Sequence, residues 1–522
     1  MFLKNKLSLS LFVTILLIGG YIAIKIQVSQ KDKKDMKLRV AFPYDKPASH
    51  YEPTRIHLGP EYIFLENIYS PLVELSNANG QPIGGVAEKF QWDEKTSEYY
   101  LHIRKGLKTI DGYEITAFDA EFSLKRLLVN SSNTHGNFKD IICPDSELET
   151  IESPCDGIEV KDKYTLILRP GEKKPFLTHI LTAIDFAVIP KTSVDPKTLA
   201  IIDYRNTSGP YYVDSSSEDG KILLRVNPNH YHYSDALPQE VEFIPSGIGT
   251  HKSSIDLYKE GKVDHITTID KLNPEKIINL SKEVNDASLH TTMDIRTFAV
   301  FFTERGLKEF SSDERLAYGM AIKDALSSYF LSQPGYQDRK QFLPPFGDGQ
   351  LSEDQKETVE QKIKNMKTDI RGEKLKLALL RVGSIENYQK PLEKALPGIE
   401  IYESNKIPAL TNYSSLEEMP HAFIGGPDIT FNEDISLITY SINAGVFGMS
   451  KVERQQWIAK YMSIIEKSAR LDMLQKLHFK SLMDGIIYPL ASSPYIALLR
   501  KPWKSHLPQI FANNPIWTIT KN

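Results

Sequence analysis

Hydrophobic and polar positions between Gly84 and Leu128 follow first one period and then another. Apolar residues occupy every second position in 90–93 and 98–104, on both sides of a polar turn, which predicts a β-hairpin. Asp111-Gly112 predicts a tight turn, because glycine tolerates a positive φ. Thr116 and Asp119 then form a capping box. One apolar helix face follows: Ala117, Ala120, Leu124, Leu127 and Leu128. The stretch therefore predicts a hairpin, a turn and an amphipathic helix packed together.

Strand-like and helix-like patterns alternate along the rest of the chain. Strands are expected at 38–42, 158–160, 164–168, 221–227, 297–302 and 375–380. Helices are expected at 63–75 and, capped by Ser311 with Glu314, at 313–326. The charged stretch 352–367 predicts a solvated helix or a mobile loop. The run 297–302 is almost continuously apolar, as in a strand buried on both faces of an α/β sheet.

The N-terminus has the pattern of an export signal. Lys4 and Lys6 precede an apolar run from Leu7 to Ile24, and further lysines follow it. The run is long enough to span a bilayer, and no Ala-x-Ala cleavage site follows it. Residues 1–30 are therefore a cleaved signal peptide or an uncleaved membrane anchor. In either case we expect a periplasmic or otherwise extracytoplasmic body.

Cys143 and Cys155 are the two cysteines of the chain, and they lie close together in a proline-bracketed loop. In an exported protein this arrangement predicts a local disulfide. A zinc site there is disfavoured, because only His135 lies nearby. His230 and His232 occupy alternate positions of a Pro-Asn loop and are expected to face solvent. We therefore predict neither a metal site nor a cofactor.

Length, charge and motifs exclude or disfavour several classes of protein. At 522 residues the chain exceeds what one core usually holds, so at least two lobes are expected. Its 63 basic and 67 acidic residues give a net charge of -4, which excludes a nucleic-acid-binding role. The sequence contains no Gly-x-Ser-x-Gly elbow, His-Glu-x-x-His motif, phosphate loop or dinucleotide fingerprint. We therefore predict that the protein is not an enzyme.

Several of these segments resemble motifs of the bacterial extracellular solute-binding proteins of family 5, which serve peptide, dipeptide and nickel ABC importers. The hairpin-helix stretch matches the family hallmark in order, at Gly85–Phe90, Tyr99–Lys108, Asp111-Gly112, Ile115–Ala117, Asp119, Phe122-Ser123 and Arg126. Weaker matches follow at the turn Asn206–Tyr211, the crossover Leu257–Asp264 and the strand Ile486–Leu490. The resemblance covers about residues 38–503, least clearly between 348 and 420.

The resemblance implies an α/β fold of the periplasmic-binding-protein type (class II, cluster C), with two lobes, an extra small domain and a ligand cleft between the lobes. Lobe I is expected to comprise residues 37–60, 158–250 and 485–522. The extra hairpin-helix domain, domain II, would comprise 61–157. Lobe II, also called domain III, would comprise 251–484.

The resemblance also points to candidate ligand-binding residues. The backbone of His57, Leu58 and Gly59 would pair with an extended peptide, although an ordinary surface loop explains this segment equally well. Asp428 is the candidate partner of a ligand ammonium, or else a turn-capping residue beside Pro427. The usual tryptophan-containing motif is absent here, which leaves the class of ligand open.

The predicted function is capture of a peptide or similar solute by hinge closure, followed by delivery to an ABC permease in the inner membrane. A monomer is expected. The alternative is a membrane-anchored extracytoplasmic sensor or scaffold that uses the same cleft without transport.

Overall fold

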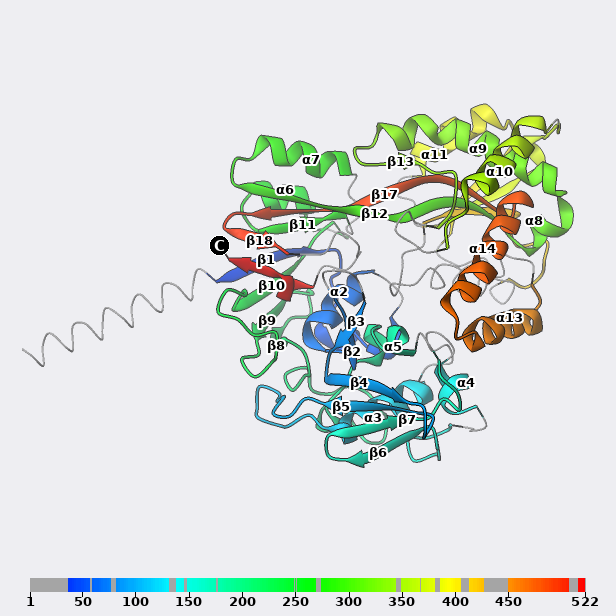
Figure 1. Ribbon diagram of the computed structural model, residues 1–522. Coiled ribbons are helices and arrows are strands. Elements are labelled where there is room, and N and C mark those ends of the chain that lie inside the picture. The colour runs from blue at the N-terminus through cyan, green and yellow to red at the C-terminus, as the bar shows by residue number, and fades with distance from the viewer. Residues whose placement is uncertain are drawn as a thin grey trace, which may run out of the picture.

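A computed structural model describes residues 36–521 of the chain (Figure 1). The segments left out of this description are 57–58, 77–80, 131–137, 145–147, 175–176, 248, 250, 269–273, 344–348, 367, 381–384, 405–412, 427–448 and 507–514. The helices are α2 (Gly59–Ile68), α3 (Ala117–Asn130), α4 (Phe138–Ile142), α5 (Leu177–Ile180), α6 (Ser254–Lys259), α7 (Pro274–Glu283), α8 (Glu304–Glu309), α9 (Ser312–Ser332), α10 (Glu353–Asn365), α11 (Glu386–Ala395), α13 (Lys451–Ser463) and α14 (Lys467–Met483).

One large sheet extends through both halves of the molecule (Figure 1). Its strands are β1 (Lys37–Phe42), β8 (Tyr211–Ser216), β9 (Ile222–Val226), β10 (Glu240–Pro245), β11 (His265–Thr267), β12 (Ala287–Phe302), β13 (Gln337–Asp338), β14 (Lys376–Leu380), β15 (Glu400–Ser404), β16 (Ala422–Gly425) and β17 (Ile487–Arg500). They lie in the order β15-β14-β16-β12-β17-β11-β1-β10-β9-β8, and β13 pairs with β17. Below, lobe I denotes the half with β1 and β8–β11, and lobe II the half with β14–β16.

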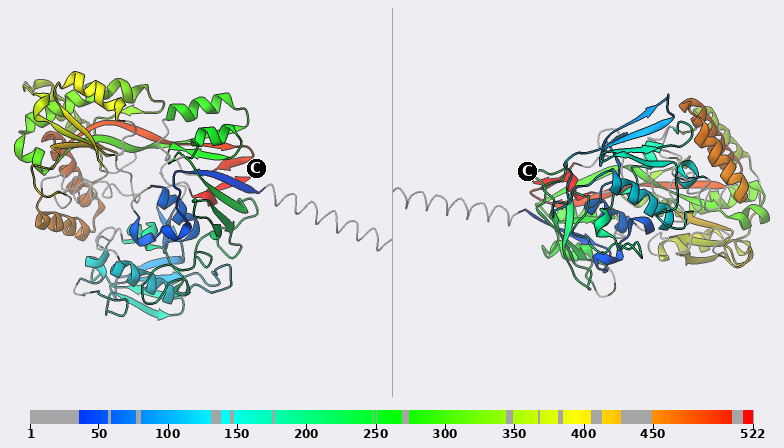
Figure 2. Two further views of the ribbon diagram at one scale, coloured as in Figure 1. Left: turned by 180° about the vertical axis from the view of Figure 1, so that it is seen from behind. Right: turned by 90° about the horizontal axis from the view of Figure 1, so that it is seen from below.

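The two longest strands, β12 and β17, connect these halves. They pair antiparallel from Ala287 with Arg500 to Phe301 with Ile487, and the views from behind and below show the same course (Figure 2). The predicted strand 297–302 is confirmed, but it is only the end of β12. The earlier part of β12 was not predicted, because His290, Asp294 and other polar residues interrupt the apolar pattern.

Helices cover the large sheet on both faces. In lobe II, Val300 and Phe302 pack with residues of α9 and α11, whereas Phe301 belongs to the cluster that includes residues of α13 and α14. In lobe I, helices α6 and α7 contribute to a smaller cluster with strand β1. The alternating faces of β12 explain why its end is apolar at every position.

The hairpin-helix unit forms as predicted. Its strands β4 (Ala87–Asp93) and β5 (Glu98–Ile103) are antiparallel, Gly112 has a φ of 90°, and the predicted apolar face of α3 is buried. Asp119 accepts hydrogen bonds from the backbone nitrogen and hydroxyl of Thr116, as a capping residue should. The same carboxylate accepts from the hydroxyl of Tyr113 and the backbone nitrogen of Lys191, which ties α3 to the 3-10 turn Lys191–Ser193.

The predicted domain limits are wrong at two places. Strands β6 (Ile158–Asp162) and β7 (Thr165–Leu168) complete the hairpin's own sheet in the order β4-β5-β7-β6, so 158–168 do not pair with lobe I as predicted. Strand β5 pairs with β4 along one edge and with β7 along the other. Residues 265–267, predicted in lobe II, form β11 between β1 and β17.

The predicted helix 63–75 also ends earlier than expected. Helix α2 stops at Ile68, and Pro71 prevents its continuation. A small antiparallel pair follows, made by β2 (Val73–Leu75) and β3 (Pro82–Gly84). Near the C-terminus, β18 (Trp503–Ser505) pairs with β19 (Ile519–Lys521).

Within the described part of residues 36–521, no helix combines the length and apolar character needed to cross a membrane. The apolar run from Leu7 to Ile24 lies outside that part. The choice between signal peptide and anchor therefore stays a prediction.

Candidate functional site

The crossing of β12 and β17 is where the halves of the molecule join. The pairing register shifts between Thr291 and Asp294, again before Arg296, and once more between Phe298 and Ala299. Such irregularities bend strands and interrupt the regular ladder of hydrogen bonds. Pro494, in the middle of β17, adds a position without a backbone donor. These features make the crossing a place where the direction of the strands can change.

Two imidazoles flank β17 within lobe I. His265 on β11 pairs with Leu499, and His290 on β12 pairs with Ala497, so both side chains lie on the same face of the sheet. Burial lowers the pKa of His265 to about 3, and His290 adds to this effect. Burial also lowers the pKa of His290. Both rings are therefore neutral at pH 7.

The segment before α2 is tied to lobe I and to domain II. Glu52 caps the short 3-10 turn Pro53–Arg55 by accepting a hydrogen bond from the backbone nitrogen of Thr54 at 3.1 Å. Its carboxylate also pairs with Arg126 of α3, whose side chain is 1% exposed. Gly59, the first residue of α2, is exposed. Of the predicted ligand-binding residues, Gly59 alone is described, because His57, Leu58 and Asp428 lie outside the described residues.

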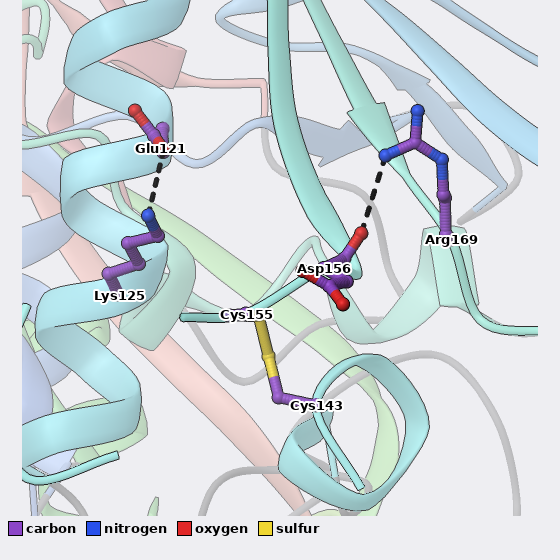
Figure 3. The surroundings of a disulfide bond; sticks show 6 residues. All are labelled: Glu121, Lys125, Cys143, Cys155, Asp156 and Arg169. Atoms are coloured by element: carbon purple, nitrogen blue, oxygen red, sulfur yellow. Dashed lines mark hydrogen bonds and ion pairs between the residues drawn. A yellow bond between two sulfur atoms is a disulfide. The ribbon is translucent and has the colours of Figure 1, made fainter. Parts of the chain in front are cut away.

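The two cysteines form the predicted disulfide (Figure 3). Cys143 directly follows α4, and Cys155 precedes β6, with their Cα atoms 5.4 Å apart. Both residues are buried. Arg169 donates to the backbone oxygen of Asp156, next to Cys155, so this end of the small sheet is held by both a covalent and a polar link.

A cavity of about 430 Å³ lies between α13 and α14 in lobe II. Its lining is Met449, Glu453, Gln456, Trp457, Lys460, Leu477, Lys480, Ser481 and Ile486. The carboxylate of Glu453 already accepts a hydrogen bond from the backbone nitrogen of Ser450, and Lys480 pairs with Asp484. Two of its charged groups are thus engaged within the helices that carry them.

The prediction that His230 and His232 face solvent is wrong, because His230 is buried and His232 is half-buried. His230 is 4% exposed, and its Nε2 lies 3.0 Å from the hydroxyl of Ser70. Its Nδ1 accepts the backbone N–H of His232, so Nε2 carries the proton and donates to Ser70. A base must instead accept the proton of the nucleophile. The contact between Ser70 and His230 is therefore not an activated nucleophile pair.

The second histidine of this loop has a different environment. His232 Nε2 lies 2.8 Å from the carboxylate of Glu74, and its ring stacks on Trp517 with centroids 4.1 Å apart. The hydroxyl of Tyr231 donates to the same carboxylate. This cluster joins β2 to the C-terminal segment. In the part of the chain that the structure describes, no group of three or more His, Cys, Asp or Glu could hold a metal ion.

Comparison with known families assigns this architecture. The family described as "Bacterial extracellular solute-binding proteins, family 5 Middle" matches residues 81–326, which include the hairpin-helix unit, the small sheet and the start of lobe II. The match covers slightly less than half of the 522 residues, and over this stretch the chain is similar to family 5. Asp119 and Arg126, two residues of the motif, are both buried.

Curated relatives support the assignment. The chain is 23% identical over 309 residues to the periplasmic oligopeptide-binding protein OppA of Escherichia coli K12, covering 57% of this chain and 55% of that protein. It is also 23% identical over 222 residues to the oligopeptide-binding protein OppA of Bacillus subtilis, covering 41% and 40%. The chain thus spans about half the length of the curated relatives it matches.

Solved structures resemble the chain over a longer range. OppA of Haemophilus influenzae, in complex with the peptide RPPGFSPFR, has a TM-score of 0.67 at 14% identity and covers 93% of this chain and 99% of that one. The binding protein DppA of Helicobacter pylori, in complex with the peptide STSA, has a TM-score of 0.69 at 16% identity, with coverage of 93% and 98%. These likenesses establish the two-lobed periplasmic-binding-protein fold.

Sequence reasoning missed the partner of Arg126. The motif included this arginine, but its contact with Glu52 joins residues 74 positions apart. An acidic residue directly before Pro53 was the only local signal, and it does not indicate which cation lies opposite.

Proposed function

We propose that this protein is the solute-binding component of an ABC importer and captures a peptide or similar small solute by closure of its lobes. One observation carries the proposal: β12 and β17 cross between the halves in a fold that matches peptide-bound binding proteins over 93% of the chain. Two bodies joined by a pair of strands can rotate about that crossing and enclose a ligand.

The proposed ligand contacts involve the backbone of one segment and one carboxylate. An extended peptide pairs with the backbone of His57, Leu58 and Gly59, which provides affinity without selecting a particular sequence. Asp428 accepts the ligand's ammonium group through a charge-assisted hydrogen bond. The exposure of Gly59 and the anchoring of the preceding residues by Glu52 support the first part.

The closed protein delivers its ligand to a permease in the inner membrane and acts outside the cytoplasm as a monomer. The relatives named as periplasmic binding proteins support this location. Binding involves no covalent change to the ligand and needs no cofactor. The anchored sensor remains the competing explanation, and it differs in predicting no solute uptake.

Binding is tested by mass spectrometry of small molecules that copurify with the protein, followed by calorimetry with a panel of synthetic di- to hexapeptides. We expect saturable 1:1 binding of at least one peptide, which is recovered intact. Absence of binding across the panel, or hydrolysis of the bound peptide, contradicts the proposal.

Transport is tested separately by deleting the gene and measuring uptake of the bound peptide. Loss of uptake supports the importer. Unchanged uptake, with residues 1–30 still present on the mature protein, favours the anchored sensor.

A further inference from the structure

Arg126 is one of the largest fully buried side chains among the described residues. Its Nη1 donates to Glu52 Oε1 at 2.9 Å, and its Nη2 donates to Glu52 Oε2, so the guanidinium and the carboxylate form a two-bond pair. Its Nε donates to the backbone oxygen of Leu199 at 2.8 Å. The arginine therefore joins helix α3 to two segments that lie on opposite sides of it in the sequence.

The carboxylate of Glu52 also organises the turn that follows it. Oε1 accepts hydrogen bonds from the backbone nitrogen and the hydroxyl of Thr54, both at 3.1 Å. The backbone oxygen of Glu52 accepts from the nitrogen of Arg55 at 3.0 Å. One acidic side chain thus fixes the 3-10 turn and receives the arginine at the same time.

The neighbouring Tyr51 is held independently of this pair. Its ring packs on Phe64 of α2 with centroids 4.4 Å apart, and its backbone oxygen accepts from the hydroxyl of Tyr204 at 2.8 Å. Residues 51–55 are therefore fixed from both sides, by the core of lobe I and by α3. Gly59 follows a few residues later in the sequence.

The backbone conformation of Leu199 is a second indication that the contacts of Arg126 serve to position the chain. It has a φ of 57°, in the left-handed region that non-glycine residues rarely adopt. Its backbone oxygen accepts from Arg126. Strained backbone of this kind persists where the surroundings impose it, and it is enriched at functional sites.

An ion pair is a costly way to fill a protein interior, because both groups lose their hydration. Well-packed apolar side chains often give equal or greater stability. What the pair adds is a fixed orientation, since the planar guanidinium donates its two hydrogen bonds to the carboxylate in one geometry.

We propose that the pair formed by Glu52 and Arg126 is a positioning element of the ligand site, which holds residues 51–56 so that Gly59 and the start of α2 meet the ligand. The role in binding rests on the proposed function. The ordering of the segment can be tested without a ligand.

The test uses the full-length variant E52Q/R126M, in which neither charge is left buried alone. R315M serves as the matched control, because Arg315 is also buried but donates to the backbone oxygens of Phe310 and Asp484 in lobe II. Hydrogen exchange of the fragment covering residues 52–56 is compared among these proteins. We expect exchange at least about tenfold faster in E52Q/R126M and unchanged in R315M.

The second readout is calorimetric affinity for the panel peptide that the wild type binds most tightly. We expect E52Q/R126M to bind it about tenfold more weakly, a change of about 1.4 kcal/mol, while R315M stays within about twofold. Unchanged exchange at 52–56 overturns the proposal whether or not a peptide binds. Faster exchange with unchanged affinity overturns it too. A wild type that binds no peptide contradicts the proposed function, and then the exchange result alone decides whether the pair orders the segment.

Discussion

The start of α3 and the crossing of β12 with β17 treat buried polar groups in opposite ways. At α3, both carboxylate oxygens of Asp119 are occupied by donors, and Ser123 is bonded on both sides. At the crossing, the hydroxyl of Ser492 and Nε2 of His290 are buried with no hydrogen-bond partner within the described residues. Where every buried polar group is hydrogen-bonded, a movement would break those bonds, so one arrangement is fixed. Where some buried polar groups have no partner, fewer hydrogen bonds are broken when strands shift. We infer that α3 belongs to a rigid body and the crossing to the moving joint.

The largest effect is expected at Asp119. D119A removes the acceptor of buried or partly buried hydrogen bonds from Tyr113, Thr116 and Lys191, and should lower the free energy of unfolding by about 4 kcal/mol. Urea denaturation followed by circular dichroism measures the change. D119N retains one acceptor oxygen and should lose clearly less. A loss below about 1 kcal/mol for D119A would show that the network is not the anchor described here.

The disulfide should act on the same rigid body. C143S/C155S opens a link across a sequence separation of 12 residues, and the chain-entropy model gives a loss of about 3 kcal/mol. Comparing the oxidised wild type with the double variant in urea measures it. Because the bond lies in domain II, peptide affinity should stay within about twofold. A large loss of affinity without a loss of stability would place the disulfide in the moving joint instead.

Acid should destabilise the fold through His265, which lies beside β17 in lobe I. The folded protein holds this ring neutral, with a pKa of about 3 against 6.5 for an ordinary histidine, so the unfolded chain binds a proton that the folded chain does not. Stability from this group is therefore lost as pH falls below about 6.5, at up to about 1.4 kcal/mol per pH unit until pH approaches 3. H265Q should remove this slope.

The exposed His506 provides the control for that measurement, as H506Q. Urea denaturation of the three proteins between pH 7 and pH 4 gives the slopes. If H265Q and the wild type lose stability in parallel, His265 is not held neutral by the fold.

The smallest effect compares one substitution in both regions. Ser123 accepts the N–H of Ile189 at 2.8 Å and donates to the backbone oxygen of Asp119, so S123A should cost about 1–2 kcal/mol. Ser492 has a buried hydroxyl for which no partner is found in the described ranges, so S492A should change stability by less than about 0.5 kcal/mol. Equal losses in the two variants would contradict the distinction between anchor and joint.

The sequence predicts the hairpin-helix unit well because its contacts are local. Thr116 and Asp119 cap one helix, and Gly112 makes one turn, all within a short stretch. The sequence predicts β12 and β17 poorly, because each strand extends only as far as it pairs with the other. Ala287, for example, pairs with Arg500, far away in the chain. The polar residues of β12 are compatible with a strand because the backbone there pairs with β17.

The candidate site is predictable only in part for the same reason. Gly59 begins a helix and is exposed, as a ligand-facing residue should be, while the roles of His57, Leu58 and Asp428 stay predictions. Arg126 was visible as a motif residue. Its contact with Glu52 required the folded chain, because no local pattern links a helix residue to a turn in another lobe.

We propose that two bodies close around a solute about the crossing of β12 and β17. Small-angle X-ray scattering of the purified protein, with and without a saturating amount of its tightest panel peptide, tests this directly. Lobe closure predicts a smaller radius of gyration in the bound state, with the peptide recovered intact. A radius that does not change although calorimetry shows full occupancy would contradict it.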